Sequence, residues 1–103
     1  DTAVPCGLII NELATNSIKH AFPDSMQGKI EIGLYSDGYE FELIVSDDGI
    51  GFQEAVDLET TEHLGLRLVS ALTQQINGTI ELDRSNGTKF RIKFRELEYA
   101  KRI

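Results

Sequence analysis

The sequence is poor in several features that define other classes of protein. Its 103 residues include one Cys and no Trp, and 10 Lys and Arg stand against 17 Asp and Glu, for a net charge of −7. One Cys excludes an intramolecular disulfide framework and a Cys-rich zinc site, which favours a reducing, cytoplasmic location. The acidic balance argues against nucleic-acid partners, which need a basic face. A small anionic ligand is compatible with this charge, because backbone amides can bind phosphate.

The chain also lacks a long hydrophobic run. Its most apolar stretch, residues 8–10, ends at Asn11 and Glu12, whereas a membrane-spanning helix needs about 20 apolar residues. The N-terminus has no basic segment followed by an apolar one, as a signal peptide would. The length predicts one domain, residues 1–103. Because an apolar helical pattern starts almost at Asp1, we expect the chain to be part of a longer protein, membrane-anchored or not.

Hydrophobic periodicity predicts both helices and strands. Apolar residues recur at every fourth position in one segment, and other segments alternate with period two. The expected elements are a helix over 3–22, strands over 30–35 and 41–45, a helix over 64–76, and strands over 79–83 and 89–95. Glycine-containing turns at 37–38 and 77–78 separate them. Adjacent antiparallel strands with helices on one face make an α+β fold, a two-layer sandwich.

The first helix carries a polar stripe on an otherwise apolar surface. At about 100° per residue, the side chains of this stripe fall within one narrow arc: Glu12, Asn16, Lys19 and His20. Carboxylate and amide oxygens are ligands for Mg²⁺, and Lys19 and His20 could meet phosphate oxygens. A solvated helix face with i, i+4 pairs explains the same residues. From this helix alone both interpretations stay open.

Two further segments could also contact a ligand. In the turn at residues 47–51, Gly49 and Gly51 let the backbone approach closely, and the Asp47 carboxylate could accept from an exocyclic amine. The free N–H groups at the start of the second helix suit phosphate. Gly65 is a poor helix former there, by about 1 kcal/mol, so its presence invites a reason. An ordinary turn and a capped core helix are the alternatives.

Together these segments resemble the ATP-binding domains of the GHKL group, which includes gyrase, Hsp90, MutL and the histidine kinases. Four motifs carry the resemblance: an N box at residues 11–22, a D-x-G-x-G box at Asp47, Gly49 and Gly51, a glycine box at 64–66 and a G-T-x-F strand motif at 87–90. Their order and spacing fit over essentially the whole chain. The N box, Asn-Glu-Leu-Ala-Thr-Asn-Ser-Ile-Lys-His-Ala-Phe, is most similar to sensor histidine kinases of the HisKA_2 and HWE-related kind.

The resemblance implies a fold, ligands and site residues. The fold would be the Bergerat-type ATPase fold, with a mixed sheet and its helices on one face. The ligands would be ATP and Mg²⁺, with Asn16 and Glu12 at the metal and with Glu12 and Lys19 as catalytic residues. Asp47 would read the adenine amine. The nucleotide-binding residues implied are Asn16, His20, Asp47, Gly49, Gly51, Leu64, Gly65, Leu66 and Thr88.

The resemblance also implies an activity and partners. A protein histidine kinase moves the γ-phosphoryl group of ATP to a His on a separate helical domain of the same parent protein, here expected to be a homodimer. The receiver domain of a response regulator then takes the phosphoryl group. Two alternatives keep the fold: a serine kinase of the anti-sigma-factor type, and a non-catalytic interaction module. Thr61 and His63, at positions where the fuller glycine box has glycines, and a short lid between Gly51 and Gly65 motivate the second.

Overall fold

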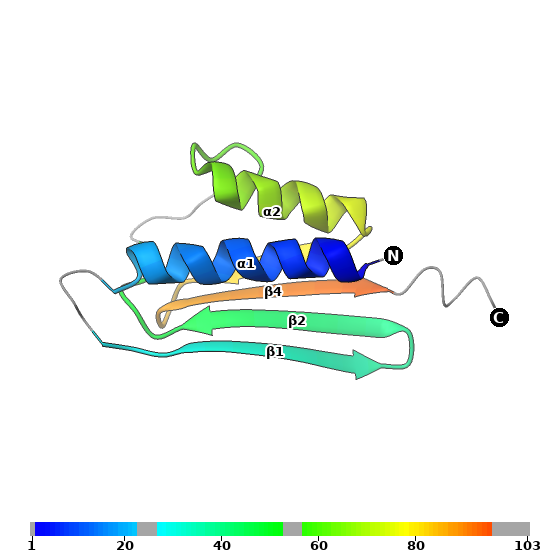
Figure 1. The fold of residues 1–103 in the computed structure, drawn as a ribbon, viewed down its shortest axis with the longest axis horizontal. Coiled ribbons are helices and arrows are strands. Elements are labelled where there is room, and N and C mark those ends of the chain that lie inside the picture. Colours follow the sequence, from blue (N-terminus) through cyan, green and yellow to red (C-terminus); the bar gives the residue numbers. More distant parts are fainter. Residues whose placement is uncertain (1, 23–26, 53–56, 96–103) are drawn as a thin grey trace.

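The computed structural model describes residues 2–22, 27–52 and 57–95. The elements, in chain order, are α1 (Ala3–His20), β1 (Ile30–Asp37), β2 (Glu40–Asp47), α2 (Leu64–Gln75), β3 (Thr79–Asp83) and β4 (Thr88–Arg95). Both helices cover the same face of one four-stranded sheet (Figure 1). The predicted α+β two-layer sandwich is therefore confirmed. Residues 96–103 of the predicted domain lie outside the described residues.

The sheet has the strand order β1-β2-β4-β3, and each neighbouring pair is antiparallel. The expectation of a mixed sheet is wrong for the described strands. Two hairpins supply two of the antiparallel pairs. The third, β2 with β4, is antiparallel because α2 carries the chain back along the sheet before β3 and β4 begin (Figure 1).

Most element boundaries follow from local sequence signals. The β3 strand has the predicted bounds, and α2 ends at an Asn–Gly pair where Asn77 adopts a φ of 56°. The first helix stops at His20, two residues earlier than predicted. A proline disfavours the helical conformation in the residue before it, so the helix ends ahead of Phe22 and Pro23. The β2 strand is longer than predicted and ends at Asp47, inside the polar turn.

The core lies between the helices and the sheet. Its most buried side chains are Ile9 and Leu13 of α1, Leu66 and Val69 of α2, and Leu43, Val45 and Ile92 of the sheet. Along α2 the row of leucines at i+4 steps is only partly buried, since Leu64 is 76% and Leu68 42% exposed. Each step turns the side chain by about 40°, so the row winds off the buried face. Neither helix of the described residues is long and apolar enough to cross a membrane.

Candidate functional site

A cavity of about 210 Å³ opens where α1, β2 and the start of β4 meet, near the end of the molecule at the left of Figure 1. Its lining consists of Asn16, Ser17, His20, Ala21, Asp47, Ile50, Gly51, Phe52, His63 and Thr88. Several predicted site residues are among them: Asn16, His20, Asp47, Gly51 and Thr88. The pairing of β2 with β4 places Asp47 opposite Thr88, which brings two distant motifs to one wall.

The Asp47 carboxylate is buried and held at both oxygens. Only 7% of the residue is exposed. Its Oδ2 accepts a hydrogen bond from the Ser17 hydroxyl at 2.6 Å, and its Oδ1 accepts one from the Gly49 N–H at 3.0 Å. A carboxylate has about four lone-pair sites, so two donors leave acceptor capacity toward the cavity. The Asp47 carboxylate is therefore fixed in orientation and can accept a further hydrogen bond from a group in the cavity.

The loop after Asp47 packs against the end of α1 on one side and against the β3–β4 turn on the other. The Ile50 N–H donates to the Ala21 carbonyl at 3.0 Å. A side chain on Gly49 would collide with the Ala21 carbonyl oxygen, and one on Gly87 would collide with the Asp47 carbonyl oxygen. Gly87 also has a φ of +74°, which L side chains rarely adopt. The glycines at these positions thus allow backbone segments to touch, and Gly49 is not part of the cavity lining.

The β3–β4 turn is fixed by its own hydrogen bonds. The Ser85 hydroxyl donates to Asp83 Oδ1 at 2.6 Å, and the Ser85 N–H donates to the same oxygen at 2.9 Å. These hydrogen bonds, the hydroxyl's first, hold the pKa of the exposed Asp83 below its ordinary value. The turn they form leads directly to Gly87, which packs against Asp47.

The first turn of α2 contributes less to the cavity than predicted. Leu66 is 2% exposed and belongs to the core, whereas Leu64 points away and is mostly exposed. Gly65 faces α1: a Cβ added there would lie 2.8 Å from Oε2 of Glu12. The Glu12 carboxylate, at the end of a flexible side chain, therefore lies close to the backbone of this turn. None of these side chains lines the cavity, and the roles that the resemblance implies for them stay predictions.

The two residues predicted as catalytic lie beside the cavity rather than on its wall. Glu12 is one helical turn before Asn16 and points toward α2, and Lys19 is exposed on α1. Mg²⁺ commonly takes one or two protein oxygens and completes its shell with substrate phosphates and water. Among the described residues, no group of three or more His, Cys, Asp and Glu could hold a metal alone. Asn16 and Glu12 each carry an oxygen donor of the kind that a metal shared with a ligand would use, and their role at a metal stays a prediction.

Part of the cavity lining is not among the predicted site residues: Ser17, Ala21, Ile50, Phe52 and His63. Three of these positions carried a signal. Ser17 falls on the apolar arc of the first helix, which is a reason to expect a buried partner for its hydroxyl. Phe52 directly follows the D-x-G-x-G box, and His63 replaces a glycine of the fuller glycine box. The His63 ring lies 6.3 Å from that of His20 and 6.5 Å from that of Phe52, between centroids.

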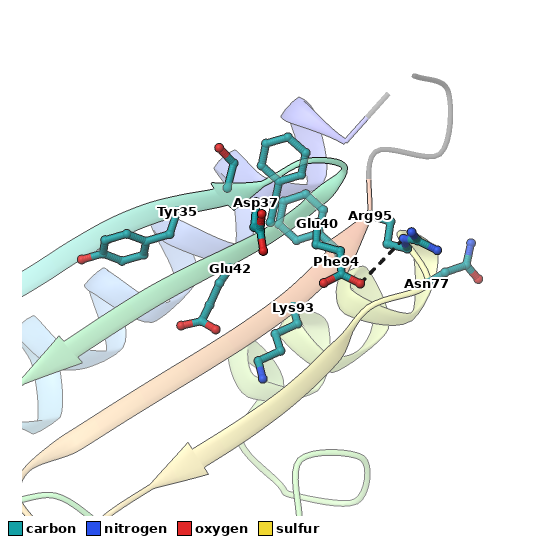
Figure 2. A pocket seen from close by; sticks show the side chains of 10 residues that line it. Tyr35, Asp37, Glu40, Glu42, Asn77, Lys93, Phe94 and Arg95 are labelled. Carbon is teal, nitrogen blue, oxygen red and sulfur yellow. Dashed lines mark ion pairs between the residues drawn. The ribbon is translucent and has the colours of Figure 1, made fainter. Parts of the chain in front are cut away.

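A larger hollow, of about 420 Å³, lies at the opposite end of the sheet, beside the β1–β2 hairpin (Figure 2). It contains no predicted site residue, and its lining mixes charged side chains with the aromatic rings of Tyr35, Phe41 and Phe94. The ion pair between Arg95 and Glu40 measures 4.0 Å, and both side chains are well exposed, at 63% and 70%. Exposed ion pairs contribute little free energy. The buried and oriented polar groups are at the smaller cavity, which is the better candidate site.

Comparison with known proteins relates most of the chain to one family. Residues 2–98 match the family described as histidine kinase-, DNA gyrase B-, and HSP90-like ATPase. The chain is similar to blue-light-activated histidine kinase 2 of Erythrobacter litoralis, with 32% identity over 82% of this chain and 25% of that protein. It is also similar to the sensor histidine kinase PdtaS of Mycobacterium tuberculosis, with 33% identity over 86% of this chain and 17% of that protein.

A solved structure extends the likeness to three dimensions. The histidine kinase domain of the Erythrobacter litoralis blue-light-activated kinase superposes with a TM-score of 0.85 and 30% identity. The match covers 94% of this chain and 46% of that one. The chain therefore spans only a minor part of the relatives that it matches. Its motifs, its fold and these matches together show that the chain belongs to the histidine kinase-, DNA gyrase B- and HSP90-like ATPase family.

Proposed function

We propose that residues 1–103 form the ATP-binding catalytic domain of a sensor histidine kinase that is part of a longer parent protein. The observation that carries this proposal is the buried Asp47 carboxylate, anchored by Ser17 and Gly49 on the wall of a cavity that Asn16 also lines. The exocyclic amine of adenine is a donor that suits this acceptor. The sensor histidine kinases among the relatives support the choice of enzyme class.

In this proposal the metal and the phosphates lie at the α1 and His63 side of the cavity. Asn16, with Glu12 one turn earlier, would hold Mg²⁺, which neutralises phosphate charge when bound. His20 lines the cavity, and Lys19 directly precedes it on the same exposed stretch of α1. These two side chains would meet phosphate oxygens, and Gly65 would leave the backbone of the first turn of α2 open to them. Catalysis would then rest on positioning and charge neutralisation.

The parent protein would transfer the γ-phosphoryl group to a His on its separate helical domain. A receiver domain of a response regulator would accept it next. A homodimeric parent, a cytoplasmic location for this domain, and the HisKA_2 or HWE-related subtype complete the proposal. They are supported by the N-box sequence and by the kinship with sensor histidine kinases.

An NMR titration of the chain with MgATP tests the proposed site. We expect the backbone amides of Gly49 and Gly51 and the side-chain amide of Asn16 to shift first. Gly38, at the hairpin beside the larger hollow, provides the internal control, because it lies at the other end of the sheet. Shifts confined to Gly38 and its neighbours would place the ligand in the larger hollow and would contradict the proposed site. The absence of any shift would favour the non-catalytic interaction module.

A further inference from the structure

Ser17 makes the shortest buried side-chain contact to the candidate adenine acceptor. The residue is 6% exposed, lines the cavity, and donates its hydroxyl to Asp47 Oδ2 at 2.6 Å. Serine hydroxyls within helices often bond to a carbonyl of their own helix. This one reaches from α1 to the end of β2 instead. A helical hydroxyl that donates to a carboxylate in the cavity wall, rather than to its own helix, indicates a role in the site.

We propose that Ser17 is a positioning residue for base recognition, which holds Asp47 in the orientation that accepts from the adenine amine. This inference rests on the proposed function. Rotation of a carboxylate about its terminal torsion is soft, so one anchor leaves the plane of the group free to turn. Gly49 anchors Oδ1 and Ser17 anchors Oδ2, and the two donors together fix the plane. Both donors also suit the ionised carboxylate, which can only accept hydrogen bonds.

The position of Ser17 also ties base recognition to the phosphate side of the cavity. It follows Asn16 directly on α1, and the same helix end holds the Asp47 loop through the hydrogen bond from the Ile50 N–H to the Ala21 carbonyl. One rigid element thus sets the distance between the base acceptor and the residue proposed for the metal. In the part of the chain that the structure describes, the hydroxyl itself contacts only the base acceptor and no group proposed for the phosphates. We therefore expect its loss to weaken binding of the base and to leave phosphate binding unchanged.

The test compares Ser17→Ala with a matched control, Ser70→Ala. Ser70 is a serine of α2 that is also 6% exposed and is not part of the cavity lining. The two probes are adenosine, which has only the base and sugar, and inorganic tripolyphosphate with Mg²⁺, which has no base. Loss of a preorganised contact of about 1.4 kcal/mol corresponds to a tenfold change in affinity. We expect Ser17→Ala to bind adenosine about tenfold more weakly and tripolyphosphate as the wild type does, and Ser70→Ala to change neither.

Two results would overturn the inference. One is an adenosine affinity of folded Ser17→Ala within twofold of the wild type, which would make Ser17 purely structural. The other is an equal loss of adenosine and tripolyphosphate binding, which would mean a general disturbance of the cavity. Should Ser17→Ala not fold, Ser17→Cys retains most of the volume with a weak donor and is expected to show the same selective loss. A wild-type chain that binds neither adenosine nor MgATP would instead refute the proposed function itself.

Discussion

The two sides of the candidate cavity differ in what their motif residues do. On the side of α1 and the sheet, Asn16, Asp47 and Thr88 all line the cavity. On the side of α2, Gly65 packs against Glu12 and Leu66 lies in the core. The residue of this side that lines the cavity is His63, just before the helix. The motif residues therefore fall into two groups, those that line the candidate cavity and those whose packing builds it. Separating them requires measurements that affect one and spare the other.

The largest expected effect concerns the packing role of the α2 side. Leu66→Ala should lower the free energy of unfolding by about 2–5 kcal/mol, because it leaves a cavity in the core. Leu64→Ala, at a residue that is 76% exposed, should change it by no more than about 0.5 kcal/mol. Chemical denaturation of both variants measures the difference. Equal and small effects would mean that α2 does not pack as described.

The contact role of the sheet side is tested next, at Asp47. Asp47→Asn replaces an acceptor oxygen by a donor and should weaken ATP and ADP alike by about 1–3 kcal/mol. Asp37→Asn is the matched control, because Asp37 lines the larger hollow beside the hairpin. Isothermal titration calorimetry of both variants gives the comparison. If Asp37→Asn weakened binding and Asp47→Asn did not, the ligand would belong in the other hollow.

A smaller and more selective effect is expected at Asn16. Asn16→Ala should remove the part of the ATP affinity that depends on Mg²⁺, because it deletes an oxygen ligand. Adenosine binding, which needs no metal, should persist. Calorimetry with and without Mg²⁺ separates the two contributions. If the ATP affinity of the variant depended on Mg²⁺ as in the wild type, Asn16 would not be a metal ligand.

The smallest expected signal is that of self-phosphorylation. His20 and His63 line the cavity that is proposed for the nucleotide, and a side chain fixed beside the phosphates is badly placed for in-line attack. The chain should therefore form no acid-labile phosphohistidine when incubated with γ-labelled ATP. Adding the helical domain of the parent as a separate polypeptide should produce slow labelling of that domain. Stable label on His20 or His63 would require a different place for the nucleotide.

The fold was predictable where local patterns determine it. Period-two alternation was enough to predict the bounds of β3, and the Asn–Gly turn at residue 77 was enough to predict where α2 ends. The i+4 row of leucines was not enough to place Leu64, because the direction of the buried face depends on how α2 sits on α1 and the sheet. The relative direction of β2 and β4 likewise depends on the path of the whole chain.

The candidate site was predictable as motifs but not as contacts. The resemblance of the combined motifs points to Asp47 and Asn16, whereas each segment by itself is equally compatible with an ordinary turn or a solvated helix face. The hydrogen bond from Ser17 to Asp47 and the contact of Glu12 with Gly65 join residues far apart in the sequence, and no local period reports such pairs. They follow only from the packing of α1 against the end of β2 and against α2.

The most direct measurement is a calorimetric comparison of ATP and GTP binding to the wild-type chain in the presence of Mg²⁺. Guanine presents a carbonyl where adenine presents its amine, so the fixed Asp47 acceptor would face another acceptor. We expect ATP to bind and GTP to bind more weakly by about 1–3 kcal/mol, which is roughly 5- to 150-fold. Equal affinity for the two nucleotides would contradict the assignment of Asp47 and, with it, the proposed adenine site.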